Sequence, residues 1–587
     1  MKKFIIPCLT SLVAMAALTG CDDVFEPAPE NNLPLDFLES NSSYAENMLG
    51  IAYIYIPDNG SISFNEVATD DAVSNDANNS YRIIASGRWT SQNNPINRWE
   101  GCRSAIQYCN LLLANLDRVT WAKDETVNML FRKRFEAEAR GLRAIHMYYL
   151  LQSHAGFDAA GNLLGVPIVE VPEDASSNFN VPRNTFAECM DAIERDAKAA
   201  LEVLPTRYGE SCFETMRSRY PGITDGQLER VFGARFTGRI CGEIIEAYLA
   251  RLALMAASPA YEASGVTWEE AANLNATIVN YSGGPDSLDP NGGTWYCDPG
   301  IDNLADYQSP AEIIWRSGKA NGTSDLEKEN FPPTLYGNGR INPTQNLVDA
   351  FPMLNGYPIT DSRAGYSDSD PYTGRDPRLA QYILYNGGTA GHDNRTITTA
   401  ADGSDNDALG KISTSTRTGY YLKKHLRQDV NCDPSTTSGK AHYTARMRYT
   451  EYFLNYAEAA NEAWGPTGTG SNGYSAYDII KAIRQRAGIG ADNGDPYLEE
   501  VKADKDLMRQ LIRNERRLEL CFEGFRFFDI RRWKSDLNAT ARGMNITGNV
   551  FTPIDVETRS YRDYMYYGPI PYSEVLKFNA LQQNAGW

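Results

Sequence analysis

Apolar side chains recur at intervals of three, four and seven residues over several long stretches, which is the spacing of one buried helix face. The run Phe131–Leu151 is typical, with Phe135, Leu142 and Ile145 on one face. Comparable runs predict further helices over Tyr44–Ile56, Trp99–Leu116, Thr185–Leu204, Thr237–Ala257, Met447–Trp464 and Ala476–Gly488. This pattern indicates a mainly α-helical protein built from successive helix pairs.

The helical period is lost between about Pro259 and Lys440. Gly, Pro, Asn and Asp crowd this region, as in YSGGPDSLDPNGG and DSDSDPYTGRDPR. Short strands are expected at Glu312–Trp315 and Gln381–Tyr385. Because long loops inside a compact domain are commonly functional, we expect a large loop-rich insertion that carries the binding surface.

The stretch Arg513–Trp533 combines an apolar helix face with a row of carboxylates. Glu515, Glu519 and Glu523 follow one another at i,i+4 spacing, and several arginines lie within one turn of them. A pair of carboxyl groups could act as acid and base in a glycosidase. Arginines this close keep carboxylates ionised, however, so that neither group could donate a proton. The sequence therefore favours a structural network of ion pairs.

The N-terminus has the pattern of a bacterial lipoprotein signal. Lys2 and Lys3 precede an apolar stretch over residues 5–18. The letters LTGC at 18–21 then resemble a lipobox, in which Cys21 becomes the first residue of the mature protein and carries the lipid. We predict a signal peptide over residues 1–20 and a lipid-anchored tether over 21–40.

Charge and motif content exclude several classes of function. The formal charge is −19 and no long basic run is present, which argues against a nucleic-acid binder. No CxxC or HExxH pattern occurs, so a zinc site is not expected. The GxGxxG match at 468–473 follows a helix rather than a strand, which indicates a loop rather than a dinucleotide site.

Acidic loops raise the question of a structural Ca²⁺ ion, but their spacing fits no EF-hand. Solvated loop acids are the preferred interpretation, and we predict no cofactor. The acids concerned are Asp368, Asp370 and Asp376 in one loop and Asp402, Asp405 and Asp407 in another.

Several aromatic residues fit neither helix nor strand periodicity and lie in polar loops, such as SGRWTSQNNP, GGTWYCDPG and LYGNGR. Flat rings of this kind can stack on pyranose faces while polar side chains bond the sugar hydroxyls. The alternative is that each ring holds its loop against the helical body. The predicted glycan-binding set is Trp89, Trp295, Tyr296, Tyr336, Asp70, Asp71, Arg82, Asn93 and Asn94.

Short motifs follow one another along almost the whole mature chain. They include RGLRA at 140–144, VPRNT at 181–185, RDPRL at 375–379, YAEA at 456–459, and ERRLEL at 515–520, followed by EGFRFFDIRRW at 523–533. In this order they resemble the SusD/RagB family, the outer-membrane nutrient-binding lipoproteins of Bacteroidetes. The stretch from 515 to 533 is the most specific of them.

The resemblance implies a fold and a role. The fold is a right-handed superhelix of tetratricopeptide-like helix pairs with a large loop-rich insertion. The implied parts are an N-terminal helical part over 41–258, a loop-rich part over 259–440, and a C-terminal helical part with a tail over 441–587. The implied role is non-enzymatic: a lipid-anchored protein on the outer membrane, facing the cell exterior, captures an oligosaccharide or polysaccharide and delivers it to a SusC-like TonB-dependent transporter.

Two other functions stay open at this point. One is a secreted glycoside hydrolase with its acid pair in the loop-rich centre. The other is a binder of a non-glycan nutrient such as a peptide. The resemblance does not fix the ligand-contacting residues, which rest on composition and position alone.

Overall fold

The computed structural model describes residues 37, 41–57, 62–306 and 308–587. Its helices are α2 (Ser42–Ile54), α3 (Ser80–Ile83), α4 (Trp99–Asn115), α5 (Glu125–His154), α6 (Phe186–Leu201), α7 (Phe213–Arg219), α8 (Asp225–Phe232), α9 (Gly242–Ala257), α10 (Trp268–Ser282), α11 (Asp325–Asn330), α12 (Gln345–Ala350), α13 (Pro377–Tyr382), α14 (Tyr449–Trp464), α15 (Ala476–Arg486), α16 (Pro496–Val501), α17 (Lys505–Glu519), α18 (Arg526–Arg532) and α19 (Tyr572–Lys577). In this part of the chain, no helix has both the length and the apolar character that crossing a bilayer requires.

The strands are short and every sheet formed by the described residues is two-stranded. They are β1 (Ala72–Ser74), β2 (Gly156–Phe157), β3 (Leu163–Leu164), β4 (Ile313–Arg316), β5 (Ala320–Thr323), β6 (Ile341–Pro343), β7 (Ile383–Leu384), β8 (Thr389–Ala390), β9 (Arg395–Thr396), β10 (Tyr421–Leu422), β11 (Lys440–His442), β12 (Ala445–Arg448), β13 (Ala541–Thr547) and β14 (Val550–Glu557).

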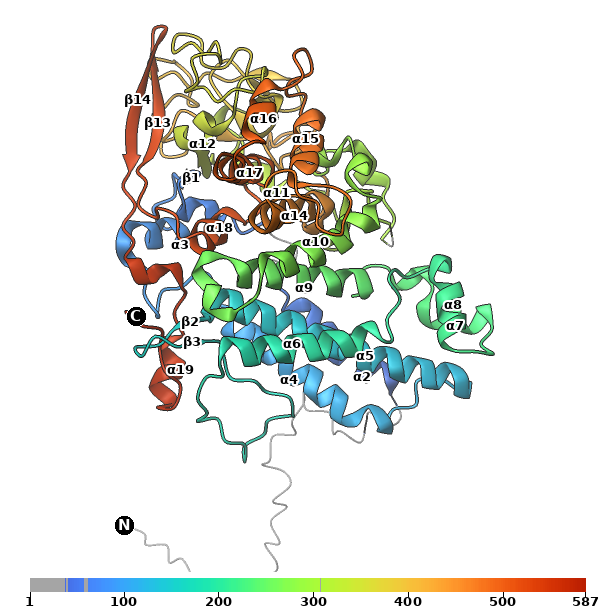
Figure 1. Cartoon of the computed structure of the whole chain (residues 1–587). Coiled ribbons are helices and arrows are strands. Elements are labelled where there is room, and N and C mark those ends of the chain that lie inside the picture. The colour runs from blue at the N-terminus through green and yellow to red at the C-terminus, as the bar shows by residue number, and fades with distance from the viewer. Residues whose placement is uncertain (1–36, 38–40, 58–61, 307) are drawn as a thin grey trace, which may run out of the picture.

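The long helices pack on one another in an unbroken series. In this series α2 contacts α4, and the contacts continue through α5, α6, α9, α10 and α14 to α17. Figure 1 shows the members up to α9 side by side in the lower half and α14 and α17 above them. The predicted class, a mainly helical stack of helix pairs, is confirmed. Helix α6 begins with a capping box: the Thr185 side chain accepts from the backbone N–H of Glu188, whose carboxylate accepts in return from the backbone N–H of Thr185.

Helix α10 was missed by the sequence analysis. The expectation of irregular chain from Pro259 onward is wrong over its 15 residues. A buried polar residue interrupts the apolar period: the Asn275 amide donates to the carbonyls of Ala271 and Ala250 and so occupies a core position. The Thr267 side chain accepts from the backbone N–H of Glu270. A threonine in this N-cap position is the sequence feature that marks the start of the helix.

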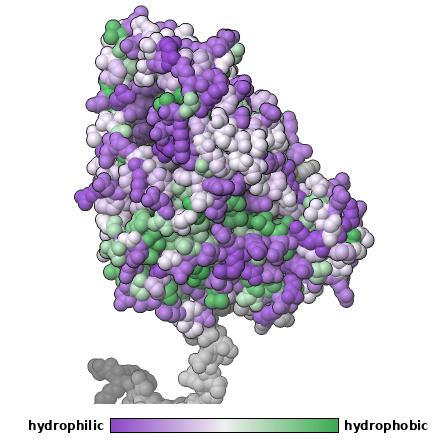
Figure 2. All heavy atoms as spheres, in the orientation of Figure 1, coloured by the Kyte–Doolittle hydropathy of each residue, from purple (hydrophilic) through white to green (hydrophobic). Residues whose placement is uncertain are grey.

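The upper half of Figure 1 holds the loop-rich part, tied together by strand pairs that are distant in sequence. Strand β1 pairs with β6, β5 with β11, and β4 with β12. The hairpin β13–β14 projects along one side. Figure 2 shows mainly hydrophilic residues over this half and a band of hydrophobic residues across the helical half below.

The predicted carboxylate row on α17 is a buried ion-pair network. Glu515 contacts Arg484 at 2.7 Å and Arg378 at 2.8 Å. Glu519, only 1% exposed, contacts Arg486 at 2.6 Å and also Arg378 at 3.2 Å. These partners come from α13 and α15, so the row joins the loop-rich part to the C-terminal helices.

Glu523 completes the row just beyond α17. It contacts Arg448 and Lys424, each at 2.7 Å. Although burial opposes the shift, these two cations lower the pKa of Glu523 to about 2. Arginines similarly lower the pKa of Glu519 to about 2 against the effect of burial. Both groups are therefore ionised at neutral pH and cannot serve as general acids.

Removing one carboxylate from this row leaves buried cations without a counter-charge. We expect Glu519→Ala to lower the free energy of unfolding by about 3–5 kcal/mol. The matched control is Glu499→Ala, which removes an exposed ion pair with Lys502 and should cost only about 0–1 kcal/mol. Urea unfolding followed by circular dichroism measures both. A Glu519→Ala protein that keeps full stability but loses ligand binding would contradict the structural role.

Candidate functional site

Trp89, the first predicted stacking residue, is 2% exposed and packs in the core. Its ring lies 4.9 Å from that of Trp587 and 5.7 Å from that of Phe527. Its indole N–H donates to the Asn94 side chain at 3.1 Å, which also gives the predicted Asn94 a structural partner. Asn93 donates from its amide to the carbonyl of Arg88 and closes the same loop. In this structure the Trp89 ring has no face open to a glycan.

Trp295 and Tyr296 are also buried. The Trp295 ring lies 5.4 Å from Tyr443 and 5.6 Å from His425. The Tyr296 ring meets that of His425 at 5.4 Å. These rings hold the loop against the body, as the alternative interpretation predicted for loop aromatics, but Trp295 also borders a cavity described below.

The predicted carboxylates Asp70 and Asp71 lie in a second ion-pair cluster. Asp70 contacts Arg517 and Arg526, each at 2.9 Å. Asp71 contacts Arg517 at 2.5 Å. Burial opposes ionisation, but the two arginines still lower the pKa of Asp70 below its usual range. Both carboxylates are thus engaged in binding the N-terminal segment to α17 and α18.

Arg82 lies nearer the surface and contacts Glu557 at 3.2 Å, beside Arg417. The predicted lipidation site, Cys21, lies outside the described residues.

Two acids of the loops considered for Ca²⁺ bind protein groups in the structure. Asp376 caps α13 and contacts Arg378, and Asp407 accepts from the backbone N–H of Thr334. Within the part of the chain that the structure describes, His, Cys, Asp and Glu side chains do not gather as a metal site.

Tyr336 is the member of the predicted set whose ring is open, at 55% exposure. It lies in the left-handed region at φ +62°, directly after the 3-10 turn Pro333–Leu335. Backbone hydrogen bonds from Tyr336 to Pro333 and from Gly337 to Pro332 fix the turn. The backbone of Ser435, and to a lesser extent the Tyr336 hydroxyl, lower the pKa of the neighbouring Asp433. An exposed ring on a fixed turn beside polar groups can stack on a sugar.

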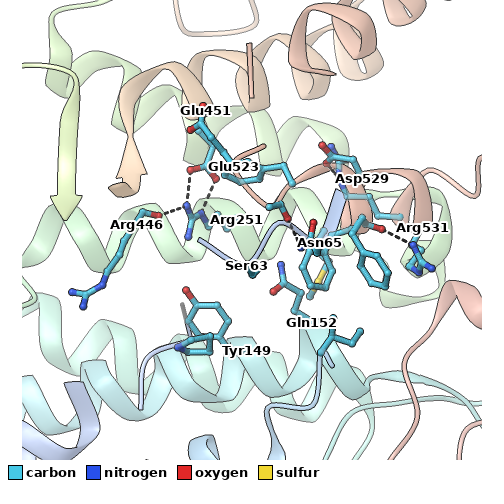
Figure 3. Close-up of a pocket in the computed structure, with 18 of the residues that line it drawn as sticks. Ser63, Asn65, Tyr149, Gln152, Arg251, Arg446, Glu451, Glu523, Asp529 and Arg531 are labelled. Carbon is cyan, nitrogen blue, oxygen red and sulfur yellow. Dashed lines mark hydrogen bonds and ion pairs between the residues drawn. The ribbon is translucent and has the colours of Figure 1, made fainter. Parts of the chain in front are cut away.

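A cavity of about 170 Å³ lies between the helical body and the segment that follows α17. Figure 3 shows Tyr149 and Gln152 on the α5 side, with Ser63 and Asn65 opposite them. Arg251 on α9 reaches across to Glu451 on α14 with two contacts of 2.6 Å. The lining comes from segments hundreds of residues apart, so no local sequence pattern indicates that they meet.

One wall of this cavity depends on a buried carboxyl group. Asn65 belongs to the 3-10 helix Asn65–Ala68, and its neighbour Glu66 is fully buried. Glu66 accepts from the backbone N–H of Gly524 at 2.7 Å, while its other oxygen has no partner among the described residues. Burial raises the pKa of Glu66 to about 7, with a smaller contribution from the nearby charge of Asp71.

The sequence profile described as "SusD family" matches residues 311–587, and the profile described as "Starch-binding associating with outer membrane" matches residues 28–219. The chain belongs to the SusD family. The two matches lie on either side of α9 and α10, which pack on each other between the two matched parts.

Relatives of known structure share the SusD fold at low identity. A SusD-like protein from Bacteroides fragilis has a TM-score of 0.69 at 22% identity, covering 95% of this chain and 100% of that one. A SusD-like carbohydrate-binding protein from the same species has a TM-score of 0.66 at 23% identity, covering 93% and 100%. SusD-like protein P2 from Formosa agariphila is 31% identical over 142 residues, 24% of each chain. The match to this last relative therefore spans about a quarter of its length.

The raised pKa of Glu66 predicts a specific pH dependence. The folded protein binds this proton more tightly than the unfolded chain, so the stabilisation is complete below about pH 4.5 and is lost as the pH rises to about 7. The shift corresponds to about 3 kcal/mol. Glu66→Gln should abolish this loss, so the stability difference between variant and wild type should grow between pH 4.5 and 7 and then level off.

Urea unfolding at pH 5, 6, 7 and 8 measures that difference directly. Glu214→Gln on α7 serves as the control, because it makes the same substitution at an exposed position. A difference between Glu66→Gln and wild type that stays constant over this range would refute the assignment.

Proposed function

We propose that this protein is a non-enzymatic glycan-binding lipoprotein of the cell surface, which captures an oligosaccharide or polysaccharide and delivers it to a SusC-like TonB-dependent transporter. Membership of the SusD family supports the proposal, since one matching profile is described as starch-binding and outer-membrane-associated. A related structure at 19% identity, with a TM-score of 0.56, is described as a laminarin-binding SusD-like protein. The lipobox at Cys21 supports an anchor on the outer membrane.

The observation that carries the binding proposal is the open ring of Tyr336. It lies in the loop-rich part, which the sequence analysis singled out for ligand binding, and its backbone is fixed before any ligand arrives. Because the backbone of the turn is already ordered, binding at Tyr336 does not cost the entropy of ordering a loop. We assign Tyr336 the stacking role and Asp433 a hydrogen-bonding role beside it. The contacts of Trp89, Tyr296, Asp70 and Asp71 support the structure instead.

The carboxylate row that ends α17 does not favour the hydrolase alternative. Glu515, Glu519 and Glu523 are each paired with at least two cations. A glycosidase needs one carboxylic acid that is protonated at working pH. These three groups supply none, because their pKa values lie below the usual range.

Isothermal titration of purified protein with soluble starch and laminarin oligosaccharides tests the binding role. Replacing Tyr336 with Ala should weaken binding of the glycan by about 5-fold or more, since truncating an aromatic side chain that anchors a ligand costs about 1 kcal/mol or more. Tyr572→Ala is the matched control, because this tyrosine is 44% exposed but lies on α19. Equal losses in both variants, or no loss in either, would refute the site.

Prolonged incubation with the same glycans tests the absence of catalysis. We expect binding without new reducing ends, because no carboxyl group of the row can donate a proton. Sustained release of reducing sugar would overturn the proposed role in favour of a hydrolase. Displacement of the bound glycan by peptides would point instead to a binder of another nutrient.

A further inference from the structure

A second and larger cavity, of about 580 Å³, lies where the helical stack meets the loop-rich part, and we call it the α9–α10 cleft. Its walls come from the start of α9, the end of α10 with the turn after it, the segment leading into β4, and the start of α14. Figure 1 shows α9, α10 and α14 in the middle of the molecule, at this boundary. Pockets for drug-sized ligands measure about 300–1,000 Å³, so the cleft has room for a ligand of that size.

Arg207 supplies a fixed hydrogen-bond donor to one wall of this cleft. Its Nε and Nη2 donate to the carboxylate of Glu243 at 2.5 and 2.8 Å, and Nη2 also donates to the hydroxyl of Tyr449. Glu243 is buried in the first turn of α9, whereas half of the Arg207 side chain is exposed. The remaining nitrogen, Nη1, has no hydrogen-bond partner among the described residues. It can therefore donate to a ligand without breaking the ion pair.

Asp289 supplies an acceptor from the turn after α10. One carboxylate oxygen accepts from the backbone N–H of Asn291 at 2.9 Å, which holds the side chain in place. The other oxygen has neither a hydrogen bond nor an ion pair in the part of the chain that the structure describes, and the same is true of the hydroxyls of Thr237 and Ser309. Asp289 is partly exposed and the other residues with unpaired groups are exposed, so these groups can reach an occupant of the cleft.

The rest of the lining supplies apolar surface. Leu288 and Pro310 are partly exposed and Pro290 is exposed. The ring of Tyr281 is also partly exposed, and its hydroxyl donates to Glu246 at 2.6 Å, which fixes the ring. Apolar surface with a few placed polar groups is the usual composition of a small-ligand site. The C–H faces of sugar rings can pack on such a surface while their hydroxyls meet the polar groups.

The charges on the walls distinguish between classes of ligand. An anion would be repelled by the carboxylate of Asp289, which no cation of the described residues neutralises. A carboxylate would also gain little from Arg207, because Glu243 already neutralises that side chain. A cation would meet the Nη1 donor of Arg207, which has no lone pair to offer it. A hydroxyl accepts from an N–H and donates to a carboxylate, so a neutral polyhydroxy ligand can use both groups.

We propose that the α9–α10 cleft binds a short neutral oligosaccharide of about two or three rings, at a site separate from Tyr336. In this site Arg207 donates to one hydroxyl, Asp289 accepts from another, and the apolar wall holds the faces of the rings. The proposal goes beyond glycan capture at Tyr336 and does not rest on it, because Tyr336 is not among the residues that line the cleft.

Titration calorimetry on the Tyr336→Ala protein tests the cleft apart from the surface site. The probes are maltotriose and laminaritriose, which are neutral, trigalacturonate, which is anionic, and triglycine, which is zwitterionic. We expect one of the neutral trisaccharides to bind with 1:1 stoichiometry, and the anionic and zwitterionic probes to bind far more weakly. Adding Asp289→Ala should weaken trisaccharide binding by about 10-fold, because a carboxylate is a strong acceptor.

Asp536→Ala is the matched control for this substitution. Asp536 also accepts a hydrogen bond from the backbone N–H of a nearby residue, Asn538, but it lies outside the cleft. Its replacement should leave trisaccharide binding unchanged. Equal losses in Asp289→Ala and Asp536→Ala would overturn the proposal.

A bulky substitution tests the site without removing any of its hydrogen-bonding side chains. Ala311 is exposed and lines the cleft, so Ala311→Trp should fill it and abolish trisaccharide binding. Thermal unfolding followed by circular dichroism should give the same melting temperature as the Tyr336→Ala protein, because the side chain replaced is not buried. No binding of either trisaccharide, tighter binding of triglycine or trigalacturonate, or unchanged binding in Ala311→Trp would overturn the proposal.

Discussion

The buried row of Glu515, Glu519 and Glu523 is the constraint on which the two halves of the molecule depend. Carboxylates are costly to bury unless cations accompany them, and here the cations arrive from α13, α15 and the residues before α14. The pairs can form only when these distant segments have all reached their places. The row therefore couples the loop-rich part to the helical stack.

This coupling also shapes the spaces where a ligand can bind. Glu523 and Gly524 lie at the end of the row and form part of the cavity wall, and Gly524 donates its backbone N–H to Glu66. The ring of Tyr336 lies on a separate fixed turn of the loop-rich part, where ion pairs do not cover it.

Local patterns predicted the parts of the fold that depend on local physics. The apolar period from Thr185 onward predicts α6, and the i,i+4 spacing of Glu515 and Glu519 predicts that they share one helix face. Helix α10 was not predicted because a polar residue, Asn275, occupies a core position in it. The Asn275 amide donates to two backbone carbonyls there, and a hydrophobicity pattern cannot reveal such bonds. Trp89 was predicted to lie at the surface because its loop is polar. In the structure it is buried by residues far away in the sequence, such as Trp587. The cavity is equally a product of distant contacts.

The central claim is that the carboxylate row is structural while the ligand contacts the loop-rich part around Tyr336. Hydrogen exchange with and without a soluble glycan that binds tests this most directly. The predicted result is increased protection in residues 331–340 and around Asp433, with little change over 513–533, where most residues are already buried. Increased protection confined to 513–533, with none at 331–340, would contradict it.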